Sequence, residues 1–176
     1  MVTKSTLIKK LAGTEPAPSV VKDQQNVNDI IKQMTAKHLK TEGDYDLIYQ
    51  YFEGGSLRDI CERLFDFCID NIELKTDSEK KQFTSSPITI LSRGTSDCKC
   101  YALFVAGVLD AMKRAGASDI DWCFRFASYN LFDLDPHHVF VVVNKKTDDI
   151  WIDPVLGTFD YHYGYWHKRD RRPQDK

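Results

Sequence analysis

The sequence predicts an α+β fold in which helices come first and a small antiparallel sheet follows. Apolar residues recur three and four positions apart, as one face of a helix requires, in residues 27–38, 57–72 and 98–114. β-branched and aromatic residues then dominate three short segments, residues 122–127, 138–143 and 150–153. A polar turn at residues 145–149 separates the last two segments, which are therefore predicted to form a hairpin.

The chain divides into one domain with two polar ends. Its 176 residues, 42% of them hydrophobic, suffice for a single core. We predict an N-terminal arm at residues 1–25, a domain at 26–165 and a basic tail at 166–176. The apolar group Leu7, Ile8 and Leu11 indicates a small helix within the arm, capped by Ser5 or Thr6. Both ends carry excess positive charge, which suggests docking of partners, although a solvated tail is the simpler interpretation.

The ends of the predicted helices are marked by short signals. Ser56 is a candidate N-cap behind two glycines, Gly43 is expected to end the helix that begins near residue 27, and Gly116 is expected to close the helix at 98–114. Residues 73–97 are interpreted as a loop with a brief extended piece at 88–91.

Charge and hydropathy exclude several classes of protein. Lys and Arg number 24 against 26 Asp and Glu, a net charge of −2, so there is no basic footprint for nucleic acid. No apolar run reaches the roughly 20 residues of a membrane span, and the first thirty residues lack the pattern of a signal peptide. We therefore expect a protein of the cytoplasm with no membrane partner.

The five cysteines call for different interpretations. An odd number without secretory context argues for reduced thiols. Cys61 and Cys68 lie in an amphipathic helix and Cys123 in an apolar strand, so all three are expected to be small buried residues. Cys98 follows Ser96 and Asp97 at the expected start of a helix, where unpaired N–H groups and the helix dipole stabilise a thiolate.

A base and an orienting acid follow Cys98 in the chain. His137 and His138 open one predicted strand and Asp153 closes the next, so antiparallel pairing would let an imidazole face the carboxylate. Cys98, one of the two histidines and Asp153 are thus candidates for nucleophile, base and orienter. Adjacent residues of a strand point to opposite faces, so only one of the two histidines is expected to meet Cys98.

Three sequence pieces carry a family resemblance: Asp97-Cys-Lys-Cys-Tyr-Ala102 before an apolar helix, His138-Val-Phe-Val-Val-Val143, and Trp151-Ile-Asp-Pro154. Together they resemble the transglutaminase-like branch of the papain-like cysteine enzymes, over about residues 57–159. The resemblance implies N-terminal helices and a nucleophile helix packed on a small antiparallel sheet, with Cys98 as nucleophile, His138 rather than His137 as base, and Asp153 as the orienting acid. It also implies a hydrolase of the protease or amidase type that acts on a protein or peptide through a thioacyl intermediate, with no metal or organic cofactor.

A wider string resembles versions of this family found in phages and mobile elements of Bacteroidetes: Ser86-Pro87, residues 93–98, and the segment 153–159. This likeness implies a phage-encoded protein of the host cytoplasm, or one incorporated in a virion. The alternative function is then a catalytically silent structural protein that binds virion or assembly partners through residues 1–25 and 166–176.

The sequence also departs from the family. Cys100 stands where the family often has Asp, and no Trp follows the nucleophile as in crosslinking transglutaminases, so hydrolysis is expected rather than acyl transfer between proteins. The Cys98 backbone N–H is a natural oxyanion donor, and the sequence identifies no second donor.

Two further alternatives stay open. Cys98, Cys100, His137 and His138 could together hold zinc, although a C-x-C pair is strained around one ion. The aromatic run at residues 159–166 is interpreted as packing at the sheet edge, with stacking on a substrate as the alternative.

Overall fold

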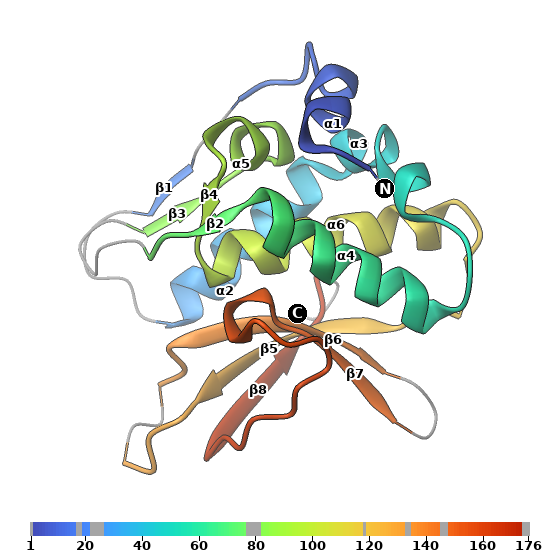
Figure 1. Cartoon of the computed structure of the whole chain (residues 1–176). Coiled ribbons are helices and arrows are strands. Elements are labelled where there is room, and N and C mark those ends of the chain that lie inside the picture. The colour runs from blue at the N-terminus through green and yellow to red at the C-terminus, as the bar shows by residue number, and fades with distance from the viewer. Residues whose placement is uncertain are drawn as a thin grey trace.

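The molecule is a layer of helices on one face of an antiparallel sheet (Figure 1). The computed structural model describes residues 2–16, 19–21, 27–76, 82–117, 119–132, 135–144 and 148–173. The larger helices are α2 (Val27–Lys40), α4 (Leu57–Asn71) and α6 (Cys98–Arg114). None of the helices in these ranges has the length and apolar content that a membrane span requires.

The sheet has the strand order β7-β6-β5-β8, with every neighbouring pair antiparallel. Its strands are β5 (Trp122–Ser128), β6 (His138–Asn144), β7 (Asp149–Ile152) and β8 (His167–Arg171). The predicted β6–β7 hairpin is confirmed, with Val141 opposite Ile152. The α+β class with a small antiparallel sheet is therefore confirmed.

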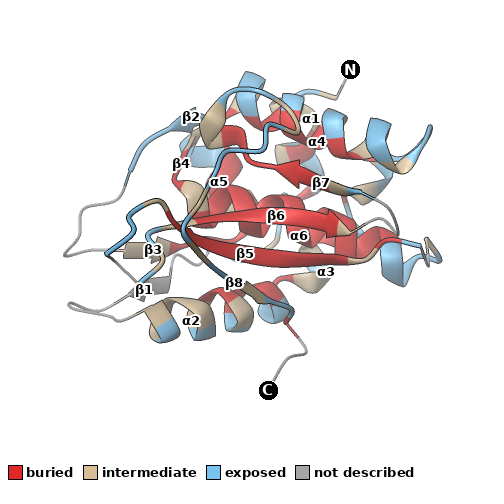
Figure 2. Cartoon of the chain, turned by 90° about the horizontal axis from the view of Figure 1, so that it is seen from below, coloured by how far each residue is buried: buried red, intermediate tan, exposed pale blue. Residues whose placement is uncertain are grey.

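Strands β5, β6 and β7 are mostly buried on both faces, whereas β8 is partly exposed (Figure 2). Alternation along the buried strands separates two clusters. Val139, Val141 and Val143 of β6 belong to the main core beneath the helices. Phe140 and Val142 point the other way and pack with Trp151, against Tyr165 from the segment before β8. Part of the aromatic run thus packs on the outer face of the sheet, where Trp151 also stacks on His162 with ring centroids 4.4 Å apart. Phe159 packs against the main core instead, and Tyr161, Tyr163 and Trp166 are exposed.

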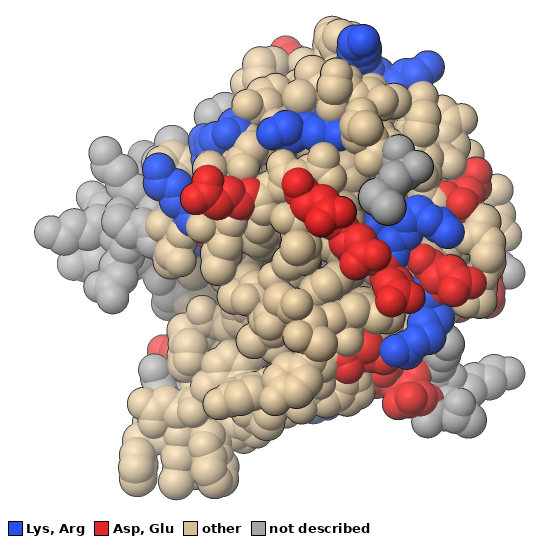
Figure 3. Space-filling model, in the orientation of Figure 1, with Lys and Arg blue, Asp and Glu red and all other residues tan. Residues whose placement is uncertain are grey.

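Helix α6 lies in the middle of the main core and begins and ends as the sequence predicts. Asp97 is its N-cap, and nearly all of its residues are buried. Helix α4 begins with a capping box in which Ser56 and Asp59 exchange hydrogen bonds, as the Ser56 signal predicts. Figure 3 shows acidic side chains in a row over α4, where Asp59, Glu62, Asp66 and Asp70 are exposed.

The segment between α4 and α6 contains more regular structure than predicted. The extended piece expected at 88–91 is wrong, because these residues lie in helix α5 (Pro87–Arg93). Pro87 stands at the start of the helix, where its missing N–H costs nothing, and Gly94 ends it with a φ of 69°. The strands β2 (Glu73–Leu74) and β4 (Thr95–Ser96) then pair in parallel, and β3 (Gln82–Thr84) pairs with β1 (Ser19–Val21).

Two predicted helix boundaries are also wrong. Gly43 does not end a helix but lies within α3 (Glu42–Asp46), which follows α2 after one residue and leads to a 3-10 turn, Tyr49–Phe52. The cap of α1 (Lys4–Lys10) is Thr3, whose side chain accepts a hydrogen bond from the Thr6 N–H, and not Ser5 or Thr6.

Both ends of the chain contact the body in the described residues. Leu7 and Leu11, from the predicted arm at 1–25, are fully buried in the main core. The predicted tail at 166–176 contains β8, the strand that pairs with β5. Asp170 of β8 accepts two hydrogen bonds of 2.8 Å from Arg125, which anchors this strand to the sheet.

Candidate active site

Cys98 is the first residue of α6 and lies directly after the helix N-cap. The Asp97 carboxylate accepts a 3.1 Å hydrogen bond from the Cys100 N–H, which fixes the first turn of the helix. Cys98 is partly exposed, whereas the other four thiols are buried. The only accessible sulfur among the described residues thus lies where the helix dipole favours a negative charge.

The neighbouring strands β6 and β7 bring His138 and Asp153 together. His138 is the first residue of β6, and Asp153 follows the last residue of β7. His138 Nε2 lies 2.6 Å from Asp153 Oδ2, and Asp153 Oδ1 accepts a 3.2 Å hydrogen bond from the Val155 N–H. The buried carboxylate of Asp153 thus has a partner at each of its two oxygens, and it fixes the orientation of the imidazole.

The imidazole of His138 also reaches Cys98. Burial lowers the pKa of His138, but hydrogen bonds to Asp153 and Cys98, and the negative charge that both groups carry when ionised, together raise it to about 10. Since Nε2 is engaged by Asp153, Nδ1 is the ring nitrogen that can serve Cys98. The structure therefore brings the three predicted residues together, with a proton retained on the imidazole at neutral pH.

His137 lies beside the same site with different contacts. Both histidines line the cavity that contains Cys98. The expected alternation does not apply to His137, because β6 begins at His138 and His137 lies before the strand. His137 Nε2 accepts a hydrogen bond of 3.5 Å from the Tyr129 N–H. Of the two, His138 is the one bonded to Asp153.

The cavity beside Cys98, of about 220 Å³, is also lined by Gln82 and Lys99, which sequence reasoning missed. The buried ammonium of Lys99 pairs with Asp97 and donates a 2.6 Å hydrogen bond to Gln82 Oε1. Gln82 belongs to β3, within a segment that the sequence predicts as loop, so no local signal pointed to it. The hydrogen bond from Lys99 identifies Oε1 as the acceptor end of the Gln82 amide, so the NH₂ group is its donor end.

Tyr129 is a second neighbour that the sequence did not indicate. Its ring centroid lies 5.9 Å from that of His138, and its buried hydroxyl has no hydrogen-bond partner. Burial, followed by the nearby charge of Asp153, raises the pKa of Tyr129 to about 12. Tyr129 therefore contributes a neutral wall beside the imidazole.

The geometry does not favour the zinc alternative. Cys98 and Cys100 are two residues apart on a helix, so their side chains diverge by about 200°, and the Cys100 thiol instead faces the Phe83 carbonyl at 3.7 Å. Within the described residues, one group has metal-ligand spacing, His38, Glu42 and Asp110. Arg114 already forms a 2.8 Å ion pair with Asp110 there, so this group is an ion-pair network.

Comparisons with known proteins bear on the fold. No protein-family model matches the chain, and no curated protein matches it. A solved structure from Parabacteroides distasonis, titled a "putative protease", is similar with a TM-score of 0.52 and 10% identity, over 74% of this chain and 27% of that chain. A "putative cysteine protease" from Cytophaga hutchinsonii has a TM-score of 0.48 and 14% identity, over 78% of this chain and 48% of that chain.

The chain thus spans about a quarter of the length of the first protein and about half of the second. At 10% identity, the likeness to the first concerns the fold alone. The phage origin and the transglutaminase-like assignment that the sequence motifs imply stay predictions. The fold of this chain also occurs in a protein described as a putative protease.

Proposed function

We propose that the chain is a cysteine hydrolase of the protease or amidase type, with Cys98 as nucleophile, His138 as acid and base, and Asp153 as orienter. The observation that carries this proposal is the 2.6 Å contact of His138 Nε2 with Asp153 Oδ2, in an imidazole that is also hydrogen-bonded to Cys98. Nucleophile, base and orienter are the parts that covalent catalysis by a thiol requires.

Acylation begins from a thiolate beside an imidazolium. The Cys98 sulfur attacks an amide carbonyl, and the carbonyl oxygen takes up the negative charge. The imidazolium of His138 then gives its proton to the leaving amine as the C–N bond breaks, which leaves a thioester on Cys98 and a neutral imidazole. Asp153 holds the ring so that the same nitrogen faces the reacting atoms throughout.

In deacylation, His138 accepts a proton instead of donating one. Neutral His138 takes a proton from a water molecule, whose oxygen attacks the thioester carbonyl. When the C–S bond breaks, the acid product leaves, Cys98 is again a thiolate and His138 again carries a proton. No metal or organic cofactor takes part in these steps.

The oxyanion needs two donors near the developing charge. The Cys98 backbone N–H is the first, because it is an unpaired N–H group of the first turn of α6. We assign the second to the NH₂ group of Gln82, because Gln82 lines the Cys98 cavity and this group is the donor end of its amide. In this proposal, Lys99 is a positioning residue.

The alternative is a catalytically silent protein that binds virion or assembly partners through residues 1–25 and 166–176. It has the same fold, so only chemistry at Cys98 separates the two proposals.

The test is cleavage of a defined mixture of peptides, read by mass spectrometry of new termini and of the acid-quenched protein. The proposal predicts new termini and a mass increase on Cys98 that equals an acyl fragment. Cys98→Ala is expected to abolish both, a loss of at least about 10³-fold, whereas Cys100→Ala, the neighbouring thiol, retains cleavage. Equal cleavage by wild type and Cys98→Ala, or none by either, would support the silent alternative.

A further inference from the structure

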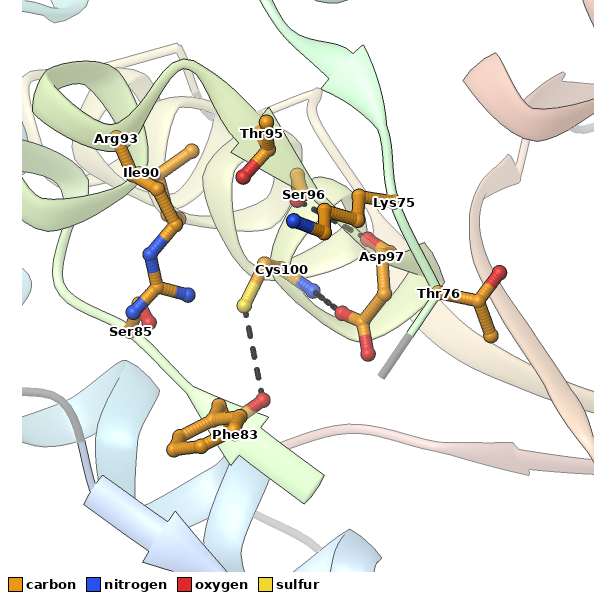
Figure 4. A pocket seen from close by; sticks show the side chains of 10 residues that line it. All are labelled: Lys75, Thr76, Phe83, Ser85, Ile90, Arg93, Thr95, Ser96, Asp97 and Cys100. Atoms are coloured by element: carbon orange, nitrogen blue, oxygen red, sulfur yellow. Dashed lines mark hydrogen bonds between the residues drawn. The ribbon is translucent and has the colours of Figure 1, made fainter. Parts of the chain in front are cut away.

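A second cavity lies on the other side of the first turn of α6, away from Cys98. It has a volume of about 310 Å³ and is named the Arg93 pocket here; its wall includes Lys75, Ser85, Arg93, Thr95, Asp97 and Cys100 (Figure 4). Because Cys98 and Cys100 diverge by about 200° on the helix, the first faces the catalytic cavity and the second faces the Arg93 pocket. Nothing in the proposed chemistry uses this pocket.

Two cations reach into the Arg93 pocket from different elements. Arg93 comes from the end of α5 and Lys75 from the residue after β2, as Figure 4 shows. Across the described residues, neither side chain has a carboxylate partner, and the Arg93 guanidinium only lies over the Phe83 ring, 5.7 Å from its centroid. Both side chains are exposed, so the pocket is open to solvent at this rim.

The one acid in the wall does not neutralise these cations. Asp97 uses Oδ1 to accept the Cys100 N–H and pairs through Oδ2 with the buried Lys99 ammonium. Its charge is therefore balanced by Lys99. The net charge facing the pocket interior is positive.

The floor of the pocket contains an unsatisfied polar group. The Ser85 hydroxyl is buried, with 2% of the residue exposed, and it makes no hydrogen bond of normal geometry. The Ser85 side chain does interact with the Cys100 thiol, which is a weak hydrogen-bonding partner. A buried hydroxyl without a strong partner is costly, and an oxyanion seated between Ser85 and Arg93 would satisfy it.

These groups match a carboxylate. Arg binds planar carboxylates through two parallel hydrogen bonds, Lys adds a point charge, and a hydroxyl can donate a third bond. A volume near 310 Å³ is at the small end of ligand cavities and fits a side chain rather than a cofactor. The pocket also shares two wall residues, Thr76 and Asp97, with the catalytic cavity, so one extended ligand can enter both.

We propose that the Arg93 pocket binds the carboxylate of an acidic residue in the substrate. This inference rests on the proposed hydrolase function. The two cavities lie on opposite sides of one helix turn, a span of about 10 Å, and an extended peptide covers about 3.3 to 3.6 Å per residue. The acidic residue is therefore expected two to four positions from the bond that Cys98 attacks.

The first test is binding, which does not depend on catalysis. N-acetylglutamate amide, its glutamine counterpart and inorganic phosphate are titrated against the Cys98→Ala protein, with thermal stabilisation as the readout. The glutamate compound is expected to bind at least about tenfold more tightly than the glutamine compound. This preference should vanish in Lys75→Gln/Arg93→Gln and persist in Lys9→Gln/Arg171→Gln, a variant that loses the same two charges at exposed positions elsewhere.

The second test is the cleavage profile of wild type on a degenerate peptide library. An enrichment of Asp and Glu over Asn and Gln at one position within four residues of the cleaved bond supports the proposal, provided that Lys75→Gln/Arg93→Gln loses it. Cleavage without acidic preference overturns it, as does a glutamate compound that binds no better than its glutamine counterpart. Stabilisation by phosphate alone would identify a free anion as the ligand and also overturn it. Specific glutamate binding without any cleavage would instead contradict the hydrolase function and leave the pocket supported.

Discussion

At the scale of single residues, buried titratable groups of this protein differ in charge: buried thiols stay neutral, whereas the buried imidazole of His138 stays protonated. Burial raises the pKa of the Cys100 thiol to about 12 and that of Cys123 to about 11, because the nearby cations do not offset desolvation of the thiolate and the nearby carboxylates add to it. His138 is also buried, but Asp153 and Cys98 outweigh the desolvation and hold its proton. The buried thiols are therefore inert, and the charged pair is confined to the Cys98 site.

The raised pKa of His138 has a consequence for stability. Since the folded-state pKa of about 10 lies above the unfolded value of 6.5, the charged imidazole stabilises the fold fully below about pH 6.5, and this contribution is lost as the pH rises through 10. At neutral pH it is on the order of a few kcal/mol. We predict that the difference in unfolding free energy between wild type and His138→Gln shrinks steadily from pH 7 to pH 10.

The measurement is urea unfolding of both proteins at a series of pH values. Taking the difference removes the contribution of the buried thiols, which changes with pH in both proteins alike. A difference that stays constant over this range would contradict the ion pair between His138 and Asp153.

At the scale of elements, the helix-forming signals are local, but the fit between helices is not. Gly107 lies in the middle of α6, where a Cβ atom would come within 2.3 Å of the Tyr45 ring of α3. Tyr45 is buried, so its ring has no free space to move into. Gly107 is thus required by close packing between α3 and α6, a fact that helical periodicity alone does not indicate.

We predict opposite effects for two Gly→Ala substitutions within helices. Gly107→Ala is expected to destabilise the protein by about 1 to 3 kcal/mol through overpacking against Tyr45. Gly43→Ala in α3, where a Cβ meets nothing within 4 Å, is expected to stabilise it by roughly 0.5 to 1 kcal/mol. The measurement is the unfolding free energy of each variant in denaturant, compared with wild type. Equal stabilisation by both substitutions would refute the packing argument.

The sequence predicts those site residues that lie next to a helix or strand with a clear local pattern. Cys98, His138 and Asp153 each stand at a boundary of a strongly patterned helix or strand, so their positions follow from those elements. Gln82 and Lys75 were missed because they lie in a segment of short strands, whose pairing depends on residues far along the chain. The helix α5 was missed because its apolar residues form too short a run to distinguish helix from strand.

At the scale of the whole molecule, the catalytic groups and the pocket surround one structural feature, the start of α6. Helix α6 supplies Cys98 and Lys99, strand β6 supplies His138, the residue after β7 is Asp153, and β3 supplies Gln82. The ends of the chain belong to the body as well, since Leu7 of α1 and its C-cap Leu11 are buried in the core and β8 extends the sheet. Of the five thiols, only Cys98, at the start of α6, is partly exposed, and the other four are buried.

The most direct test of the central claim is the pH dependence of alkylation at Cys98 by iodoacetamide, measured by mass spectrometry. Because the pKa of His138 is raised to about 10, its imidazolium faces Cys98 throughout pH 6 to pH 9, so in wild type the alkylation rate at Cys98 is expected to change less with pH than it does in His138→Gln, while the four buried thiols react slowly. In His138→Gln, which lacks that charge, the rate is expected to rise with pH as it does for a thiol in a model peptide, which is roughly 100-fold slower at pH 6.5 than when fully ionised. Identical pH profiles in the two proteins would contradict an activated Cys98–His138 pair.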